Sequence, residues 1–397
     1  MNKSTDFLSP HLWNFFKNYI ELDTSLASGE NYPKAILLLQ AMLKGLDFET
    51  EVVSIPVNVA KGNNRQHLIA RKFASNKLPT VLIYNHIDVV SADYPHAFVF
   101  SLKDGKVFGR GASDHKGGTV AVLDAFEKLL NKNIRFNLVF WVTTDEETDQ
   151  LDQLRFMTHK LKLPKNTLVY DTDTFAGGVT IAHLGSLQFS IKILGKSAHS
   201  AMSNLGVNSI EQAALLISHF FSRIKLKYEK QVSEFKAFRS SNLKFVCSRC
   251  NVNTIAGGNA INTIPEYCKF QVDCRYIPEA NTYKEKETLI QDLEKFCKKN
   301  YIHVEINNIL ITEGYGSNSK YGEELSKLYR KVSGESELCC ILGSTPLAQW
   351  AKDQGLPHIG LGVARGENNV HGVGEFVTIK DMDEVSRTLQ KFLVNKS

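Results

Sequence analysis

The chain has 397 residues, of which 43% are hydrophobic and 22% are charged, and its formal net charge is +5. This length exceeds the size at which a single hydrophobic core keeps growing, so we expect two domains. The small net charge and the dispersed lysines do not suit nucleic-acid binding, and no apolar run is long enough for a transmembrane helix.

The start of the chain and the cysteine content predict a cytoplasmic protein. Residues 1–10 are polar and lack the basic cap and apolar core of a secretory signal. The seven cysteines, an odd number in a long chain, are typical of reduced thiols. Cys247 and Cys250 form one Cys-X-X-Cys pair without a second pair, so we expect incidental thiols there rather than a zinc knuckle.

Helical and strand patterns alternate over the first part of the chain. Apolar residues recur at helical spacing over residues 11–22 and 32–46. Further along, the pattern predicts strands over 51–55, 67–70, 80–84, 136–142 and 168–170, and a helix over 119–130. Helices between buried strands indicate an α/β/α sandwich, in which ligands gather beyond the carboxyl ends of the strands.

The pattern changes near residue 183. Residues 187–194 and 268–277 alternate apolar and polar positions, as strands with one solvated face do, and helices are predicted over 209–224 and 284–298. Strand and helix character like that of the first part returns after residue 313 and ends in a helix over 381–393. We therefore predict a larger α/β domain formed by residues 1–182 and 313–397, with a smaller α+β domain inserted at 183–312.

A histidine and a carboxylate stand two residues apart at the end of the predicted strand 80–84. Side chains two apart on a strand point to the same face, so His86 and Asp88 are expected to project together. A histidine that binds a metal usually has its second ring nitrogen held by an acceptor, a role that suits Asp88. Alone, the pair is a common chance occurrence.

Further acidic and histidine residues follow other predicted elements. Asp114 lies in the glycine-rich stretch 109–118, which lacks the spacing of a phosphate-binding P-loop. The adjacent Glu146 and Glu147 point in opposite directions on an extended chain, so one could hold a metal and the other a water, although a helix N-terminus also favours acidic residues. The remaining candidates are Asp171 and Asp173 after the strand 168–170, and His371 and Glu375 near the C-terminus.

The charges of these residues favour a metal site. If Asp88, Asp114, Glu146, Glu147 and Asp171 converge, their negative charges share a poorly solvated cleft, which is prohibitive unless they are protonated or neutralised. Two divalent cations would nearly balance them. Nitrogen and oxygen ligands without cysteine suit zinc, and also cobalt or manganese, and a metal pair can polarise a carbonyl.

Together, these motifs resemble the co-catalytic zinc aminoacylase and carboxypeptidase family, which includes acetylornithine deacetylase, succinyl-diaminopimelate desuccinylase, glutamate carboxypeptidase and cytosolic dipeptidases. The motifs are His-X-Asp-Val-Val, Gly-Arg-Gly-X-X-Asp-X-Lys-Gly, Asp-Glu-Glu, an acid at a strand end and a late His-X-X-X-Glu. The resemblance implies a zinc-peptidase-like catalytic domain, an inserted two-layer lid, and homodimerisation through that lid.

The resemblance also implies roles for single residues. His86 and Asp171 would hold one metal, Glu147 and His371 the other, Asp114 would bridge them, and Asp88 would orient His86. Asp173 competes with Asp171 for its position. Glu146 would be the general base that accepts a proton from the attacking water and passes it to the leaving amine. The peptide bond after Asp114 would be cis, which is rare before a residue other than proline.

The inserted domain carries the implied substrate-binding residues. His199 resembles a histidine that stabilises the oxyanion, often from the partner subunit, and Asn262 and Arg275 resemble the pair that grips a substrate carboxylate. A surface ion pair between Arg275 and Asp273 is the alternative, although their spacing on one strand face makes it awkward. The other histidines, His115 among them, are expected to be structural or surface residues.

We expect a hydrolase that cleaves an amide bond next to a free carboxylate, in a small peptide or an N-acyl amino acid. Two other classes remain open: a metal-holding binding protein without catalysis, and a two-metal phosphoesterase. The presence of both Glu146 and Glu147 counts against the first, and the second would want more basic residues. The desuccinylase's Ser-Asp-Gly-Arg segment has no counterpart in residues 343–349, which leaves the acyl group open.

Overall fold

The structure is a computed structural model that describes residues 7–25, 29–60, 62–148 and 150–394. The chain forms two compact units. The first comprises residues up to 181, residues 317–339 and residues from 350 onward, and the second comprises residues 182–316 and 340–349. The sequence predicts an inserted segment at 183–312 and does not indicate that residues 340–349 belong with the second unit.

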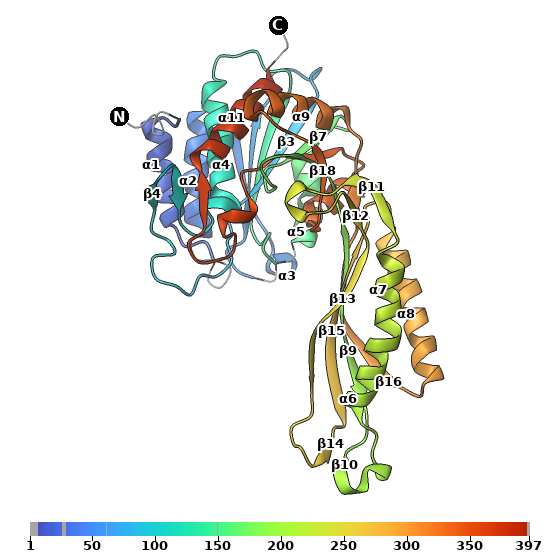
Figure 1. Ribbon diagram of the computed structural model, residues 1–397. Coiled ribbons are helices and arrows are strands. Elements are labelled where there is room, and N and C mark those ends of the chain that lie inside the picture. The colour runs from blue at the N-terminus through green and yellow to red at the C-terminus, as the bar shows by residue number, and fades with distance from the viewer. Residues whose placement is uncertain (1–6, 26–28, 61, 149, 395–397) are drawn as a thin grey trace. The chain divides into compact units, whose positions relative to one another are not determined.

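A mixed sheet forms the centre of the first unit (Figure 1). Its strands follow the spatial order β1-β2-β6-β3-β7-β19-β8. Their bounds are β1 Glu49–Ser54, β2 Gln66–Lys72, β3 Thr80–His86, β6 Asn137–Thr143, β7 Thr167–Asp171, β8 Val179–His183 and β19 His358–Gly360. β6, β3, β7 and β19 run parallel, and β3, β6 and β7 are buried along their whole length, as predicted for a sheet covered on both faces.

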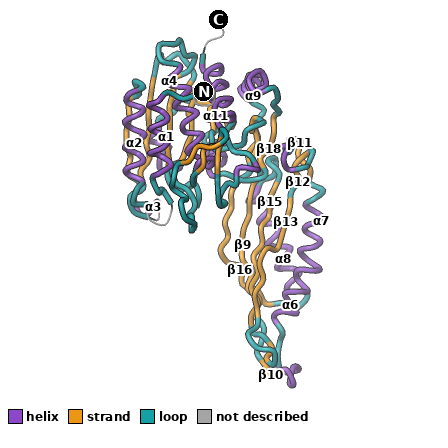
Figure 2. Tube along the Cα trace, turned by 60° about the vertical axis from the view of Figure 1, so that its left-hand side comes forward, coloured by secondary structure: helices purple, strands orange, loops and turns teal. Residues whose placement is uncertain are grey.

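Amphipathic helices cover this sheet. Figure 2 shows α1, α2, α4 and α11 beside one another, and α4 packs against both α1 and α11. α1 begins after Ser9, whose side chain accepts a hydrogen bond from the Leu12 N–H. The helices are α1 Pro10–Glu21, α2 Tyr32–Gly45, α3 Val57–Ala60, α4 Gly117–Lys128, α5 Leu151–Leu161, α9 Lys320–Ser333, α10 Pro346–Asp353 and α11 Ile379–Leu393.

A small antiparallel sheet joins the C-terminal part of the first unit to its middle. β5 (Lys106–Phe108) pairs with β4 (Ser101–Lys103) on one side and with β20 (Phe376–Thr378) on the other. This pairing places Glu375 beside the glycine-rich loop that follows β5. The loop then forms the wide turn η1 (Ala112–Lys116), in which Asp114 and His115 have non-helical backbone angles, and leads into α4.

The second unit is a four-stranded antiparallel sheet with helices on one face. The spatial order is β13-β15-β9-β16, formed by Arg249–Gly257, Tyr267–Tyr276, Gly185–Leu194 and His303–Thr312. Apolar side chains on alternate positions of β9 and β15 are buried beneath the helices. Those helices are α6 Ser209–Leu215, η3 Leu216–Phe221 and α7 Ser222–Tyr228, which are continuous, and α8 Thr282–Lys299.

Shorter elements complete the structure. They are β10 Ala198–His199, η2 Ser200–Leu205, β11 Val232–Lys236, η4 Arg239–Ser241, β12 Phe245–Cys247, β14 Thr263–Ile264, β17 Tyr315–Gly316, β18 Leu338–Ile341 and η5 Gly366–Asn368. The α/β fold with an inserted α+β segment confirms the predicted fold class. Within the described parts of the chain, every helix is too short or too polar to cross a bilayer.

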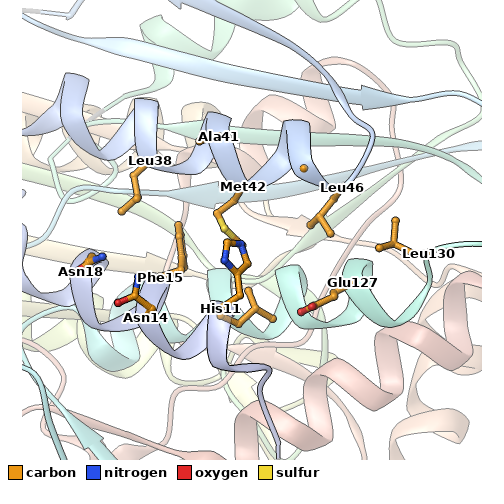
Figure 3. Close-up of a pocket in the computed structure, with 12 residues that line it drawn as sticks. His11, Asn14, Phe15, Asn18, Leu38, Ala41, Met42, Leu46, Glu127 and Leu130 are labelled. Atoms are coloured by element: carbon orange, nitrogen blue, oxygen red, sulfur yellow. The ribbon is translucent and has the colours of Figure 1, made fainter.

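A surface cavity of about 380 Å³ lies between α1 and α2 (Figure 3). His11 rises from α1 into it, opposite Met42 of α2, and apolar side chains such as Leu38 and Leu46 surround the ring. None of the candidate site residues lines this cavity.

Candidate active site

The carboxyl ends of the parallel strands bring the candidate residues together. His86 is the last residue of β3, Glu146 and Glu147 follow β6, and Asp171 is the last residue of β7. In the strand register His86 lies opposite Thr143 of β6. Parallel strands present their carboxyl ends at one edge of a sheet, so these loops form a common rim.

His86 is fully buried and presents one nitrogen to acidic neighbours. Its Nδ1 lies 3.1 Å from the carbonyl oxygen of Asp88 and 3.5 Å from the Oδ1 of that residue, so Nδ1 carries the proton. Its Nε2 faces two carboxylates, at 3.3 Å from Oδ1 of Asp114 and 3.7 Å from Oδ2 of Asp173. Asp88 also accepts the Glu147 N–H at 3.0 Å, which holds the two neighbouring loops together.

A second group forms around His371. Its Nε2 lies 2.9 Å from Oδ2 of Asp114 and 3.1 Å from Oε2 of Glu147. The two carboxyl oxygens of Asp114 thus face different histidines, one toward His86 and one toward His371. This is the arrangement that a bridging carboxylate requires. The peptide bond between Asp114 and His115 is cis, as the resemblance implied.

The structure places Asp173, and not Asp171, beside His86. Asp171 is still part of β7, and its carboxylate turns to His358, with 3.3 Å between Oδ2 and Nε2. Its other oxygen accepts the N–H of Asp173 at 2.9 Å. The geometry thus favours Asp173, the competitor that the sequence leaves open, over Asp171 as the partner of His86, because the Asp173 carboxylate lies 3.7 Å from Nε2 of His86.

Glu375 supports the loop that carries Asp114. Its carboxylate accepts the backbone N–H groups of Gly111, Ser113 and Asp114 at 2.9 to 3.0 Å. It also forms a buried ion pair with Arg110 at 2.8 Å. Because an anion buried among backbone donors is strongly held, Glu375 fixes the path of the chain at Asp114.

Asp145 belongs to the Asp-Glu-Glu motif, which by itself indicates no role for it, and Arg65 belongs to no motif. Asp145 has a positive φ of 66°, and its side chain forms an ion pair with Arg65 at 2.8 Å. Gln153 of α5 donates to the same carboxylate at 2.7 Å. These contacts hold the turn that aims Glu146 and Glu147 at the rim. Nothing in the local sequence of Arg65, which precedes β2, marks it as a partner of residue 145.

The ionisation of the rim residues shows how crowded the negative charge is. Burial raises the pKa of Glu146 well above its ordinary value, and the Asp173 carboxylate raises it further. Burial also raises the pKa of Asp173, to which Asp114 adds. The pKa of Asp114 would be raised by burial, but hydrogen bonds from His371 and His86 lower it well below its ordinary range.

These residues fit a pair of divalent cations. Among the described residues, Nε2 of His86 and Oδ1 of Asp114 are buried without a hydrogen-bond partner, although buried polar atoms are nearly always paired. Ligand atoms of Asp114, Glu147 and His371 lie within 4.8 Å of one another, and so do those of His86, His115 and Asp173. Converging lone pairs from imidazoles and carboxylates are what such cations bind.

Residues 82–395 match the model of Peptidase family M20/M25/M40. The chain belongs to this family. The resemblance drawn from the motifs is thereby confirmed, and so is the assignment of the chain as a metal-dependent hydrolase of amide bonds.

Relatives of this M20 chain include deacylases. It is 25% identical over 298 residues to the acetylornithine deacetylase of Buchnera aphidicola subsp. Acyrthosiphon pisum, which covers 73% of this chain and 74% of the relative. It is 26% identical over 331 residues to the succinyl-diaminopimelate desuccinylase of Orientia tsutsugamushi, covering 79% of this chain and 80% of the relative.

Solved M20 structures share the fold. The aminopeptidase PepT of Bacillus cereus superimposes with a TM-score of 0.76 at 18% identity, covering 98% of each chain. The YXEP protein of Bacillus subtilis, described as a dinuclear metal binding peptidase of the M20 family, gives a TM-score of 0.63 at 13% identity, covering 96% of each chain.

The second unit of the M20 chain carries the predicted substrate-binding residues. His199 of β10 pairs with Thr263 of β14, and the carbonyl of Asn262 accepts the Ser200 N–H at 3.0 Å, so His199 and Asn262 lie in adjoining segments. Both are exposed.

Arg275 lies elsewhere in this unit, on β15. Its Nε forms an ion pair with Asp273 at 3.0 Å, and its Nη1 donates to Ser344 at 3.2 Å. The interpretation that this pairing is awkward was wrong, because side chains two apart on one strand face lie adjacent and a long guanidinium can fold back.

Proposed function

We propose that this chain is a two-zinc hydrolase that cleaves the amide bond next to a free carboxylate, in a small peptide or an N-acyl amino acid. The observation that carries the proposal is the convergence of unpaired imidazole and carboxylate atoms around Asp114. His86 and Asp173 would hold one ion, Glu147 and His371 the other, and Asp114 would bridge them. Cobalt or manganese would suit the same nitrogen and oxygen ligands.

The ions would act as Lewis acids on the scissile carbonyl and would make a water more acidic. The remaining steps are assigned to side chains of this chain. Glu146 is half-buried at the rim, and its raised pKa suits a group that accepts a proton from the attacking water and then donates it to the departing nitrogen. Asp88 keeps the proton of His86 on Nδ1, which leaves Nε2 free to bind.

Arg275, His199 and Asn262 are the candidates for substrate binding. Within the part of the chain that the structure describes, Nη2 of Arg275 donates to no protein acceptor, and guanidinium groups bind carboxylates bidentately. His199 could donate to a carbonyl oxygen as its charge develops. The names of the relatives point to N-acylated amino acids, and the structural neighbours point to short peptides, so both classes need to be assayed.

The function is tested with the zinc-reconstituted full-length protein. The panel contains N-acetyl and N-succinyl amino acids and di- and tripeptides, each beside a matched compound whose carboxylate is amidated. We expect hydrolysis of at least one free acid and a loss of most of kcat/KM for its amide. Hydrolysis of a phosphodiester and of no amide, or no hydrolysis by protein that holds two ions, would contradict the proposal.

We also propose that the chain is a cytoplasmic homodimer that associates through the second unit. Around β10 and β14 the large apolar side chains of Met202, Leu205, Ile261 and Tyr267 are exposed, which is typical of an association surface when they lie together. All seven cysteines are free, as expected in a reducing compartment. Light scattering coupled to gel filtration measures the mass, and a mass of 44.5 kDa at micromolar concentration would contradict dimerisation.

A further inference from the structure

His115 stands next to the bridging carboxylate, at the variable position of the Asp-X-Lys-Gly motif, and the sequence predicts only a structural or surface role for it. In the structure it is buried, and its ring lies over Gly118 at the start of α4. A Cβ on Gly118 would come within 2.3 Å of Cε1 of His115, so the glycine leaves the space that the ring occupies. The ring lies nearly parallel to that of His86, with 5.4 Å between centroids.

Hydrogen bonds determine which nitrogen of His115 carries the proton. Thr172 donates its only hydroxyl proton to the carbonyl of Tyr84 at 2.6 Å. The 2.7 Å contact between Nε2 of His115 and the Thr172 oxygen must therefore be donated by the histidine. The neutral ring thus carries its proton on Nε2 and presents a lone pair on Nδ1.

That lone pair faces the rim. Nδ1 of His115 lies 3.9 Å from Oδ1 of Asp173, and Nε2 of His86 lies 3.7 Å from the other oxygen of the same carboxylate. The ligand atoms of the three residues lie within 4.8 Å of one another. Three acceptors that meet in a buried place repel one another, and a cation among them relieves all three contacts at once.

We propose that His115 is an additional ligand of the metal ion held by His86 and Asp173. This inference rests on the proposed two-metal site. It gives the first ion two imidazoles and the second ion one, that of His371. An imidazole-rich ligand set favours zinc, cobalt or nickel over manganese. The first position would therefore bind zinc more tightly than the second and would discriminate more strongly against manganese.

X-ray absorption spectroscopy of the protein loaded with two zinc ions tests the assignment directly. We expect three imidazoles for two zinc ions in the wild type and two in His115→Gln, whose side-chain amide can still donate to Thr172. His67→Gln is the matched control, because His67 is also buried and neutral but lies outside the cluster, and it should keep all three. Titration should show the affinity for the first zinc at least about tenfold lower in His115→Gln.

The number of imidazole ligands in the wild type is decisive by itself. The test therefore remains valid even if the His115→Gln variant does not fold. Two imidazoles in the wild type would overturn the proposal and leave His115 as a packing residue. A protein with two zinc ions and three imidazoles that hydrolyses none of the panel would contradict the proposed function and still support this ligand. If the protein bound only one zinc ion and left the position at His371 empty, the proposed function would be contradicted, whatever the result for His115.

Discussion

At the scale of single residues, the chemistry depends on which of several adjacent acids faces the rim. The motifs predict that His86, Asp114, Glu146, Glu147 and His371 meet in space, and the structure brings Asp114 to 3.3 Å from His86 and 2.9 Å from His371. They could not separate Asp171 from Asp173, because the choice depends on where β7 ends. The strand includes Asp171 and turns that side chain to His358, a contact between distant segments that no local pattern reports.

Replacing Glu146 with Gln tests the proton transfer. The amide has nearly the same shape but cannot accept a proton, so we expect kcat to fall by about 10²- to 10⁴-fold while the zinc content stays unchanged. Turnover is measured with the best substrate of the panel, and zinc by elemental analysis after gel filtration. Activity close to that of the wild type would refute the role of Glu146.

Asp173→Asn and Asp171→Asn form a matched pair that separates the two acids. Asp173→Asn should lose one zinc ion on dialysis, because a neutral amide is a much weaker ligand. Asp171→Asn keeps an oxygen that can accept the Asp173 N–H, so it should retain both ions and lose less than tenfold in affinity. The reverse pattern would restore Asp171 as the ligand.

At the scale of elements, a chain of hydrogen bonds ties three of them behind the rim. Trp141 of β6 donates to Nδ1 of His67 in β2 at 3.3 Å, and Nε2 of His67 then donates to Gln153 of α5 at 3.1 Å. Gln153 donates in turn to Asp145. The helices and strands themselves could be predicted from periodicity. This network could not, because its members lie far apart in the sequence and each looks like an ordinary polar residue.

Burial of His67 predicts a pH dependence of stability. Burial lowers the pKa of His67 from 6.5 to about 4. As the pH falls below 6.5, the unfolded chain gains a proton and the folded chain does not, so the free energy of unfolding decreases until about pH 4 and then levels off. The contribution is on the order of 3 kcal/mol. Denaturant unfolding measures the free energy of unfolding between pH 4 and 7. Its dependence on pH should be shallower in His67→Gln than in the wild type, and an equal dependence would contradict this role of His67.

Arg65→Met tests the turn that aims the two glutamates. The change leaves Asp145 buried beside Gln153 without its cation, so the turn should relax. We expect a fall in kcat of at least about tenfold with the protein still folded by circular dichroism. Arg71→Met, which removes an exposed ion pair with Glu51, is the control and should behave like the wild type. Equal activities in both variants would contradict the role of Arg65.

At the scale of the whole molecule, every proposed metal ligand belongs to the first unit. Binding to the folded state alone stabilises it by about 2.7 kcal/mol when the free ion is at 100 times its Kd. Removing metal with a chelator should therefore lower the unfolding temperature of the first unit and leave that of the second unit in place. Differential scanning calorimetry with and without zinc measures this, and equal shifts of both transitions would contradict it.

The change of pattern near residue 183 predicts a second domain, but no pattern predicts that residues 340–349 belong with the second unit. That segment supplies Ser344, whose oxygen accepts from Arg275. The sequence of this segment has no pattern that links it to the second unit, and only its contacts in the folded structure place it there.

The pairing of β20 with β5 has a consequence for synthesis. The loop around Asp114 exists early in the nascent chain, yet the acceptor for three of its N–H groups is Glu375, which is translated more than 250 residues later. A ribosome-bound intermediate that stops before this glutamate would carry nearly all the ligands and still lack the anchor that arranges them. The site would thus stay unassembled until Glu375 emerges, and a truncation that removes Glu375 should give a chain that binds no metal at this site rather than one that binds it more weakly.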